Sequence, residues 1–197
     1  MERIELYPDH TIDEIITHFK EIFYNTKPND ITYIYIVCHS SRSGYLYLGT
    51  DETYITPTKL RELCDENIKG TVVVMIESCF SGTVIGQSTS QVEDDELDCS
   101  EYILNEFINS SSSNTTLTTS KYKVICSSRK DETSIGGDLS LATKYWSLGG
   151  GWNQNKNKEC KLKADVNKDN KVTLNELYNY SYKKVKKERP KHHICAY

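Results

Sequence analysis

The fold is decided by the stretch Val73-Val74-Met75-Ile76-Glu77-Ser78-Cys79-Phe80-Ser81-Gly82. Its first part is an apolar, β-branched run of the kind that forms a buried strand. Its second part changes to small, polar and reactive side chains, as expected where a strand ends and a loop begins. We therefore expect a strand over Thr71–Ile76, followed by a loop that carries the thiol of Cys79.

A second apolar and β-branched run, Ile31–Cys38, precedes this strand in the sequence. We expect it to form a central strand that is covered on both faces. A helix that begins at Thr56-Pro57 and ends at Gly70 lies between the two runs, so the strands should be parallel and adjacent, about 4.8 Å apart. His39 follows the first strand directly. The imidazole and the thiol of Cys79 should then lie at the same edge of the sheet, where open α/β sheets place their active sites.

An imidazole beside a thiol can polarise it toward the thiolate, which is the reactive nucleophile. Gly82 would leave room for a substrate backbone to approach. The alternative is that Cys79 is a buried apolar filler and His39 a hydrogen-bonded turn residue, and the two positions alone leave both interpretations open.

The rest of the chain alternates apolar runs with helical patterns, which predicts an α/β class. A capping box at Thr11 opens a helix that should end near Asn25, and Leu139–Leu148 is ambiguous. We expect one domain over residues 1–197, with further strands at 3–7, 122–126 and 193–196, a hairpin arm at 45–48, a helical pattern at 103–108, loops at 110–113 and 149–163, and a last helix from Leu174.

Composition excludes several classes of function. Of the 197 residues, 37% are hydrophobic, which is enough for one globular core. The net charge is −4, so the chain lacks the basic character expected of a nucleic-acid-binding protein. The longest apolar run is far shorter than the roughly 20 residues of a membrane span, and the N-terminal residues do not form a signal peptide. We therefore expect no nucleic acid or membrane partner and a cytoplasmic location by default. Seven cysteines without C-x-x-C spacing fit neither a disulfide framework nor a zinc site.

Four segments together resemble one known family. The strand ends around His39 and Cys79 are similar to the paired His and Cys motifs of the caspase-like cysteine peptidases of clan CD. The strand 122–126 with the loop 127–134 looks like that fold's next strand and substrate loop. Bacterial members also carry a late segment like Ala164–Tyr178. The resemblance favours a type similar to bacterial metacaspases, clostripain and legumain.

The resemblance implies a caspase-like three-layer sandwich, with a mostly parallel central sheet and helices on both faces. It also implies an endopeptidase that hydrolyses peptide or protein chains through a thioester. Cys79 would be the nucleophile and His39 the general base and acid. The backbone N–H groups of Ser40 and Cys79 would form the oxyanion hole.

Specificity is expected from Glu77, which stands two residues before the cysteine. Related enzymes with an acidic residue there use it in the pocket for the residue that precedes the scissile bond. A partly buried carboxylate favours Lys or Arg and repels Asp. Asp131 is a candidate second pocket acid, although a solvated loop charge is the simpler interpretation.

Two departures from the family pattern support a different hypothesis. The residue after His39 is Ser40, where the family has glycine, so a left-handed backbone there would be strained. Nothing in the chain supplies the strand and helix with which the family fold begins, so we expect the sheet to lack its first strand. The alternative function is a catalytically inactive caspase-like module with a calcium-stabilised protein-binding role. The oligomeric state stays open.

The second chemical motif is an EF-hand-like loop over residues 165–176. Its oxygen-bearing positions are suitably filled for Ca²⁺. Asn170 replaces the usual glycine at the sixth position and tolerates the left-handed conformation. Thr173 and Glu176 also form a capping box with or without a metal. A bound ion would order the start of the last helix, and activity could depend on it. The candidate ligands are Asp165, Asn167, Asp169, Lys171 through its carbonyl, Thr173 and Glu176.

Overall fold

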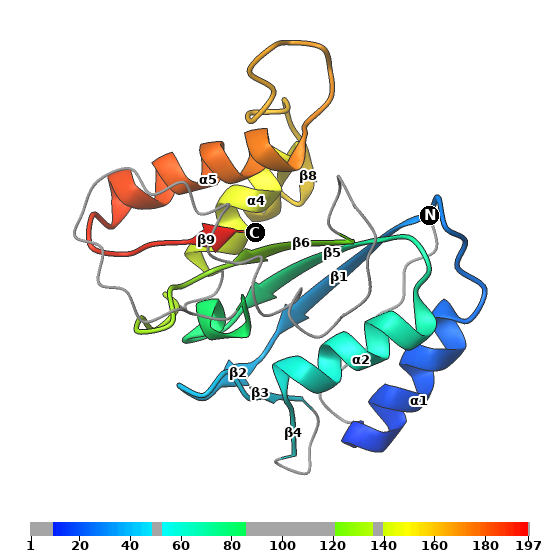
Figure 1. Ribbon diagram of the computed structural model, residues 1–197. Helices are drawn as coiled ribbons and strands as arrows, with labels where there is room; N and C mark the ends of the chain where they lie inside the picture. The colour runs from blue at the N-terminus through cyan, green and yellow to red at the C-terminus, as the bar shows by residue number, and fades with distance from the viewer. Residues whose placement is uncertain (1–9, 49–52, 86–120, 136–139, 197) are drawn as a thin grey trace, which may run out of the picture.

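The computed structural model describes residues 10–48, 53–85, 121–135 and 140–196 (Figure 1). The strand expected at 3–7, the helical pattern at 103–108 and the serine tract at 110–113 lie outside these residues.

A four-stranded sheet forms the centre of the molecule, in the order β1-β5-β6-β9. β1, β5 and β6 are parallel to one another, and β9 is antiparallel to β6. These positions confirm the expected strands, although β5 is one residue longer than expected, β1 one residue shorter and β9 two residues shorter. The strands are β1 (Ile31–Val37), β5 (Thr71–Glu77), β6 (Tyr122–Cys126) and β9 (Cys195–Ala196).

Helices cover both faces of the sheet, as expected for the three-layer α/β class (Figure 1). On one face, α1 (Ile12–Phe23) and α2 (Pro57–Asn67) pack against one apolar cluster that includes Val72, Val74 and Ile76 of β5. On the other face, α4 (Leu141–Gly149) and α5 (Leu174–Glu188) enclose a second cluster around Ile125 of β6.

The helix starts follow from capping residues that the sequence shows. Thr11 accepts a hydrogen bond from the Glu14 N–H, and the Glu14 side chain accepts from the Thr11 N–H, which completes the expected capping box. Thr56 caps α2 in front of Pro57. The ambiguous segment 139–148 contains α4, capped by Ser140.

The expectation that β1 is central and covered on both faces is wrong for the described residues. Within them β1 lies at the edge of the sheet, and its side chains alternate between buried and exposed. The physical reason is that α4 covers this face of β1 only in part, at Tyr35, which contacts Thr143 and Trp146. The side chains left exposed there are Ile31, Tyr33, Tyr35 and Val37.

Two small antiparallel sheets complete the described structure. One consists of β2 (His39–Ser40), β3 (Leu46–Tyr47) and β4 (Tyr54–Ile55), which includes the expected hairpin arm. The other pairs β7 (Trp152–Asn153) with β8 (Lys158–Glu159), within a segment expected to be loop throughout. Among the described residues, none of the helices has both the length and the apolar character needed to cross a lipid bilayer.

Candidate active site

Strand register brings His39 and Cys79 to one place. Val37 of β1 is paired with Glu77 of β5, and the Cys38 N–H donates to the Glu77 carbonyl at 3.3 Å. His39 and Cys79 each follow their paired residue by two positions, so they lie at the same carboxyl edge of the sheet. His39 is exposed and Cys79 is half-buried, so both can meet a substrate.

Hydrogen bonds tie the two strand ends together. The Ser40 hydroxyl donates to the Cys79 carbonyl, and the Ser78 hydroxyl donates to Ser40 Oγ at 2.9 Å. No hydrogen bond joins His39 to Cys79 within the described residues, where Cys79 Sγ lies 3.9 Å from Ser134 Oγ. Catalytic hydrogen bonds are often long before substrate binds, so this geometry fits a resting nucleophile.

The backbone after His39 is not strained. Ser40 is in extended β2 and is absent from the residues with positive φ in the described chain, whereas Phe80, directly after Cys79, has a φ of 54°. The N–H of Cys38 faces β5, and N–H groups alternate along a strand, so the N–H of Ser40 also faces the Cys79 side. The strained position is therefore Phe80, directly after Cys79, and the Ser40 N–H faces the side of Cys79.

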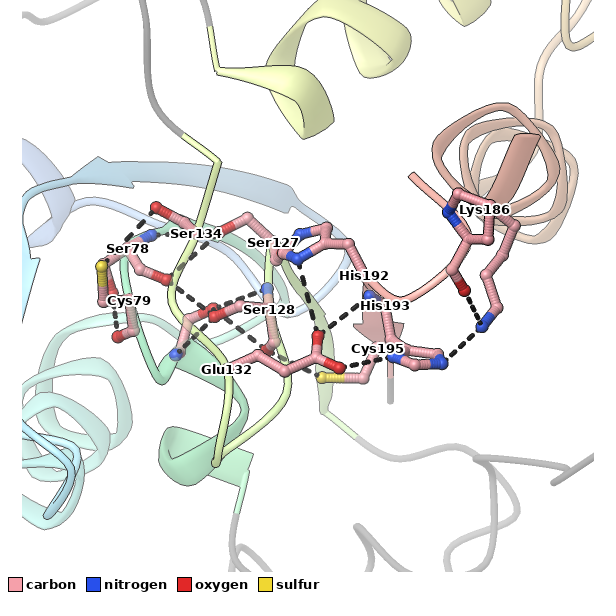
Figure 2. Close-up of polar contacts among 12 residues, drawn as sticks. Ser78, Cys79, Ser127, Ser128, Glu132, Ser134, Lys186, His192, His193 and Cys195 are labelled. Atoms are coloured by element: carbon pink, nitrogen blue, oxygen red, sulfur yellow. Dashed lines mark hydrogen bonds and ion pairs between the residues drawn. The ribbon is translucent and has the colours of Figure 1, made fainter. Parts of the chain in front are cut away.

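A buried serine network fixes the loop after β5 against the loop after β6 (Figure 2). Ser128 Oγ donates to the Ser78 carbonyl at 2.9 Å and accepts from the Ser81 N–H at 3.2 Å. Ser127 Oγ accepts from the Ser78 N–H at 3.1 Å. These four serines are almost completely buried. Because buried polar groups must be paired, the network positions the backbone on both sides of Cys79.

A second set of polar contacts supports the turn after Cys79 from the segment before β9 (Figure 2). The Phe80 N–H donates to the Glu132 carbonyl at 2.7 Å. The Glu132 carboxylate accepts from the His193 N–H at 2.9 Å and contacts His193 Nδ1, while Lys186 contacts His193 Nε2. His192 Nε2 lies 2.9 Å from the Ser127 carbonyl. The segment before β9 thus holds both loops next to Cys79.

Glu77 is 5% exposed and lies at the N-terminus of α4. Its Oε2 accepts hydrogen bonds from Ser140 and, at 3.0 Å, from Thr143. Its Oε1 is buried without a hydrogen-bond partner in the described chain. Burial, together with the Glu77 charge, raises the pKa of nearby Tyr35. A buried carboxylate oxygen without a partner is unfavourable until a donor reaches it.

Gly82 does not serve the role expected of it. It is buried, and a Cβ atom there would lie 2.9 Å from the Lys130 nitrogen and 3.0 Å from Cys195 Sγ. The close approach that requires glycine is therefore to the chain's own loop after β6 and to β9, rather than to a substrate backbone.

Asp131 is exposed and lines an open groove of about 680 Å³. Arg42, Phe80, Arg189 and Lys191 also line this groove. Arg42 and Phe80 come shortly after His39 and Cys79 in the sequence, so the groove begins next to the two expected catalytic residues. Glu77 is not among the lining residues, so the structure places the two expected pocket acids apart.

In the loop at 165–176, backbone N–H groups donate hydrogen bonds to the loop's own carboxylates. The two carboxylate oxygens of Asp165 accept from the N–H groups of Asp169 and Asn170 at 3.2 and 3.1 Å, and Asp169 accepts from the Lys171 N–H at 2.8 Å. Asn170 has a φ of 63°, in the left-handed region expected for it. Glu176 forms the expected capping box with Thr173. No cluster of three or more His, Cys, Asp or Glu suited to a metal ion occurs in the described residues.

Sequence reasoning missed the supporting residues around Cys79. Ser127 and Ser128 directly follow a buried strand, and that position is a usable signal for a role at the sheet edge. Glu132, His192 and His193 carry no such signal, because their meeting depends on β9 returning beside β6.

Comparisons with known proteins give the fold alone. No protein-family model matches the chain, and no curated protein matches it in sequence. Among solved structures, the crystal structure of caspase-1 from Spodoptera frugiperda is similar, with a TM-score of 0.59 and 13% identity over 99% of this chain and 70% of that one. The caspase-like fold expected from the motifs is therefore confirmed.

Proposed function

We propose that this chain is a cysteine endopeptidase that cleaves peptide or protein substrates after Lys or Arg. The observation that carries the proposal is the Val37 and Glu77 pairing, which brings His39 and Cys79 to one sheet edge within a caspase-like fold. The unpartnered oxygen of Glu77 supports the basic preference. The sequence motifs around His39 and Cys79 favour a type similar to metacaspases, clostripain and legumain.

The chemistry requires few groups. His39 accepts the thiol proton of Cys79, and the sulfur attacks the carbonyl carbon of the scissile bond. The N–H groups of Ser40 and Cys79 stabilise the oxyanion. Collapse of the tetrahedral intermediate breaks the C–N bond, and His39 returns the proton to the leaving amine. Water then hydrolyses the thioester and frees the sulfur.

Glu77 would select the substrate by charge. Its Oε2 is held by the α4 cap, which leaves Oε1 to accept from an ammonium or guanidinium group. An Asp side chain would place a second negative charge in the same buried site, at a cost of several kcal/mol. Asp131 lines a groove that Glu77 does not line, so we do not include it in this pocket.

The test is covalent labelling with a peptidyl acyloxymethyl ketone that carries Lys, compared with an Asp version. We expect only the Lys probe to label the wild type, and Cys79→Ala to abolish labelling. Cys160→Ala is the matched control, because Cys160 is also a half-exposed free thiol and should not matter. Glu77→Gln should remove the preference for Lys. Labelling of a folded Cys79→Ala variant would contradict the proposal.

A catalytically inactive module is the second candidate. The observation that favours it is the lack of a hydrogen bond between His39 and Cys79 in the described residues. The extended backbone of Ser40 weighs against it, since the strain expected there is absent. A folded wild type that neither probe labels, with Cys79 no more reactive than Cys160 toward iodoacetamide, would establish the inactive module.

We also propose that the loop at 165–176 binds Ca²⁺. Asp165, Asn167, Asp169, Thr173 and Glu176 would supply side-chain oxygens, and Lys171 its carbonyl. The support is conformational: the loop has left-handed residues at Lys168 and Asn170, and its carboxylates already accept from its own N–H groups. The ion would order the start of α5, whose far end leads to the Glu132 contacts. Repeating the labelling with a chelator tests whether activity depends on it.

A further inference from the structure

We propose that the groove lined by Arg42, Asp131, Arg189 and Lys191, called the basic groove below, is a second substrate subsite that takes an acidic side chain. This inference rests on the proposed peptidase function. It adds to the basic preference at Glu77 an acidic preference at another position of the same peptide.

The basic groove adjoins the expected catalytic residues. Phe80, which follows Cys79, and Arg42 both line it. Ser134, whose hydroxyl lies 3.9 Å from Cys79 Sγ, stands between the lining residues Thr133 and Ile135. A peptide bound at Cys79 therefore has the groove within reach of a neighbouring side chain.

Within the described residues, the cations of the groove form no ion pair. No described carboxylate lies within 4.0 Å of the charged nitrogens of Arg42, Arg189 or Lys191. The Arg42 guanidinium lies 5.4 Å from the centre of the Phe80 ring. An arginine held over an aromatic ring keeps its N–H donors available at the edge, where they can bind a carboxylate.

The acids of the groove do not balance this charge. Glu132 has a side chain that is 20% exposed, and its carboxylate is engaged by His193. Asp131 is the remaining acid, and it is exposed. Among the described lining residues, three cations therefore face one available carboxylate, which favours an anionic substrate group.

The experiment is a peptide library in which Lys occupies the cleaved position and all neighbouring positions vary. We expect one position at which Asp or Glu raises kcat/KM about 3- to 10-fold over Ala, a modest factor because the groove is open to solvent. The preference should fall as salt rises. Arg189→Glu and Lys191→Glu should each abolish or reverse it, whereas Lys69→Glu, on an exposed lysine outside the groove, should leave it unchanged.

The outcomes separate the two proposals. Cleavage after Lys without an acidic preference at any position, or with one that Arg189→Glu and Lys191→Glu leave intact, overturns the subsite alone. No cleavage after Lys by the wild type overturns the peptidase and the subsite together. Asp131→Asn should strengthen the acidic preference. If it instead weakens the selection of Lys, Asp131 belongs to the basic pocket and the acidic subsite is overturned.

Discussion

The sheet edge at Cys79 and the loop at 165–176 are both visible as short motifs, but they are built in opposite ways. Hydrogen bonds at the edge join residues far apart in sequence, such as Ser40 and Ser78, which are 38 positions apart, and Ser127 and His192, which are 65 positions apart. In the loop, the Val166 N–H reaches Glu176 across 10 positions, and Asp169 reaches Asp165 across 4. The edge depends on the whole fold, whereas the loop is largely self-contained.

The largest expected effect concerns the chemistry of the edge. His39→Ala should lower kcat for a Lys peptide by about 10²- to 10⁴-fold, because general acid and base catalysis is lost. The unfolding midpoint should hardly change, since His39 is exposed. His18→Ala, on the surface of α1, is the control and should leave kcat unchanged. An equal loss in both variants would contradict the assignment.

The next effect concerns the buried serines. Ser128→Ala should reduce the free energy of unfolding by about 1–3 kcal/mol, because the Ser78 carbonyl and the Ser81 N–H lose their shared partner. Ser43→Ala, at an exposed serine, should change it little. Urea denaturation of both variants measures the difference. If Ser128→Ala is as mild as Ser43→Ala, the network does not stabilise the edge.

Alkaline pH should affect the buried core and leave the loop unaffected. Burial raises the pKa of Cys38 and of Cys64 from 9.0 to about 12. Between these values the unfolded thiols ionise and the folded ones do not, so stability is intact below about pH 9 and falls as pH rises toward 12. The loss at pH 10 is about 1 kcal/mol per thiol. The free energy of unfolding, measured by denaturation at several pH values, should fall less steeply with pH in Cys64→Ala than in the wild type. An equally steep fall in both would show that the Cys64 thiol is not its cause.

The smallest expected effect is that of calcium on the loop. Millimolar Ca²⁺ should raise the melting temperature by about 1–4 °C, since an unpaired loop of this kind binds weakly. Asp169→Asn should remove the shift and keep the fold, because Asn can still accept from the Lys171 N–H. Equal shifts in the wild type and Asp169→Asn, or a shift with Mg²⁺ alone, would contradict a specific calcium site.

The same contrast explains what the sequence could predict. The strand β5, the capped helices and the left-handed Asn170 follow from local patterns, and the structure has them where expected. The edge position of β1 within the described residues does not follow, because an apolar run does not show whether another strand pairs beside it. Sequence spacing placed His39 beside Cys79 because parallel strands share an edge. It could not place Glu132 beside His193, since that contact depends on the path of α5 and β9.

The contacts between Glu132 and His193 have a consequence for biosynthesis. The turn at Phe80 is held by Glu132, and Glu132 is held by His193, which lies 113 positions after Phe80 in the sequence. At ribosomal speeds of about 5–20 residues per second, roughly 6–20 seconds separate the synthesis of the two. A nascent chain therefore carries the Cys79 thiol for that time without the contacts that position it, so the proposed peptidase would stay inactive toward neighbouring nascent chains until its fold is complete.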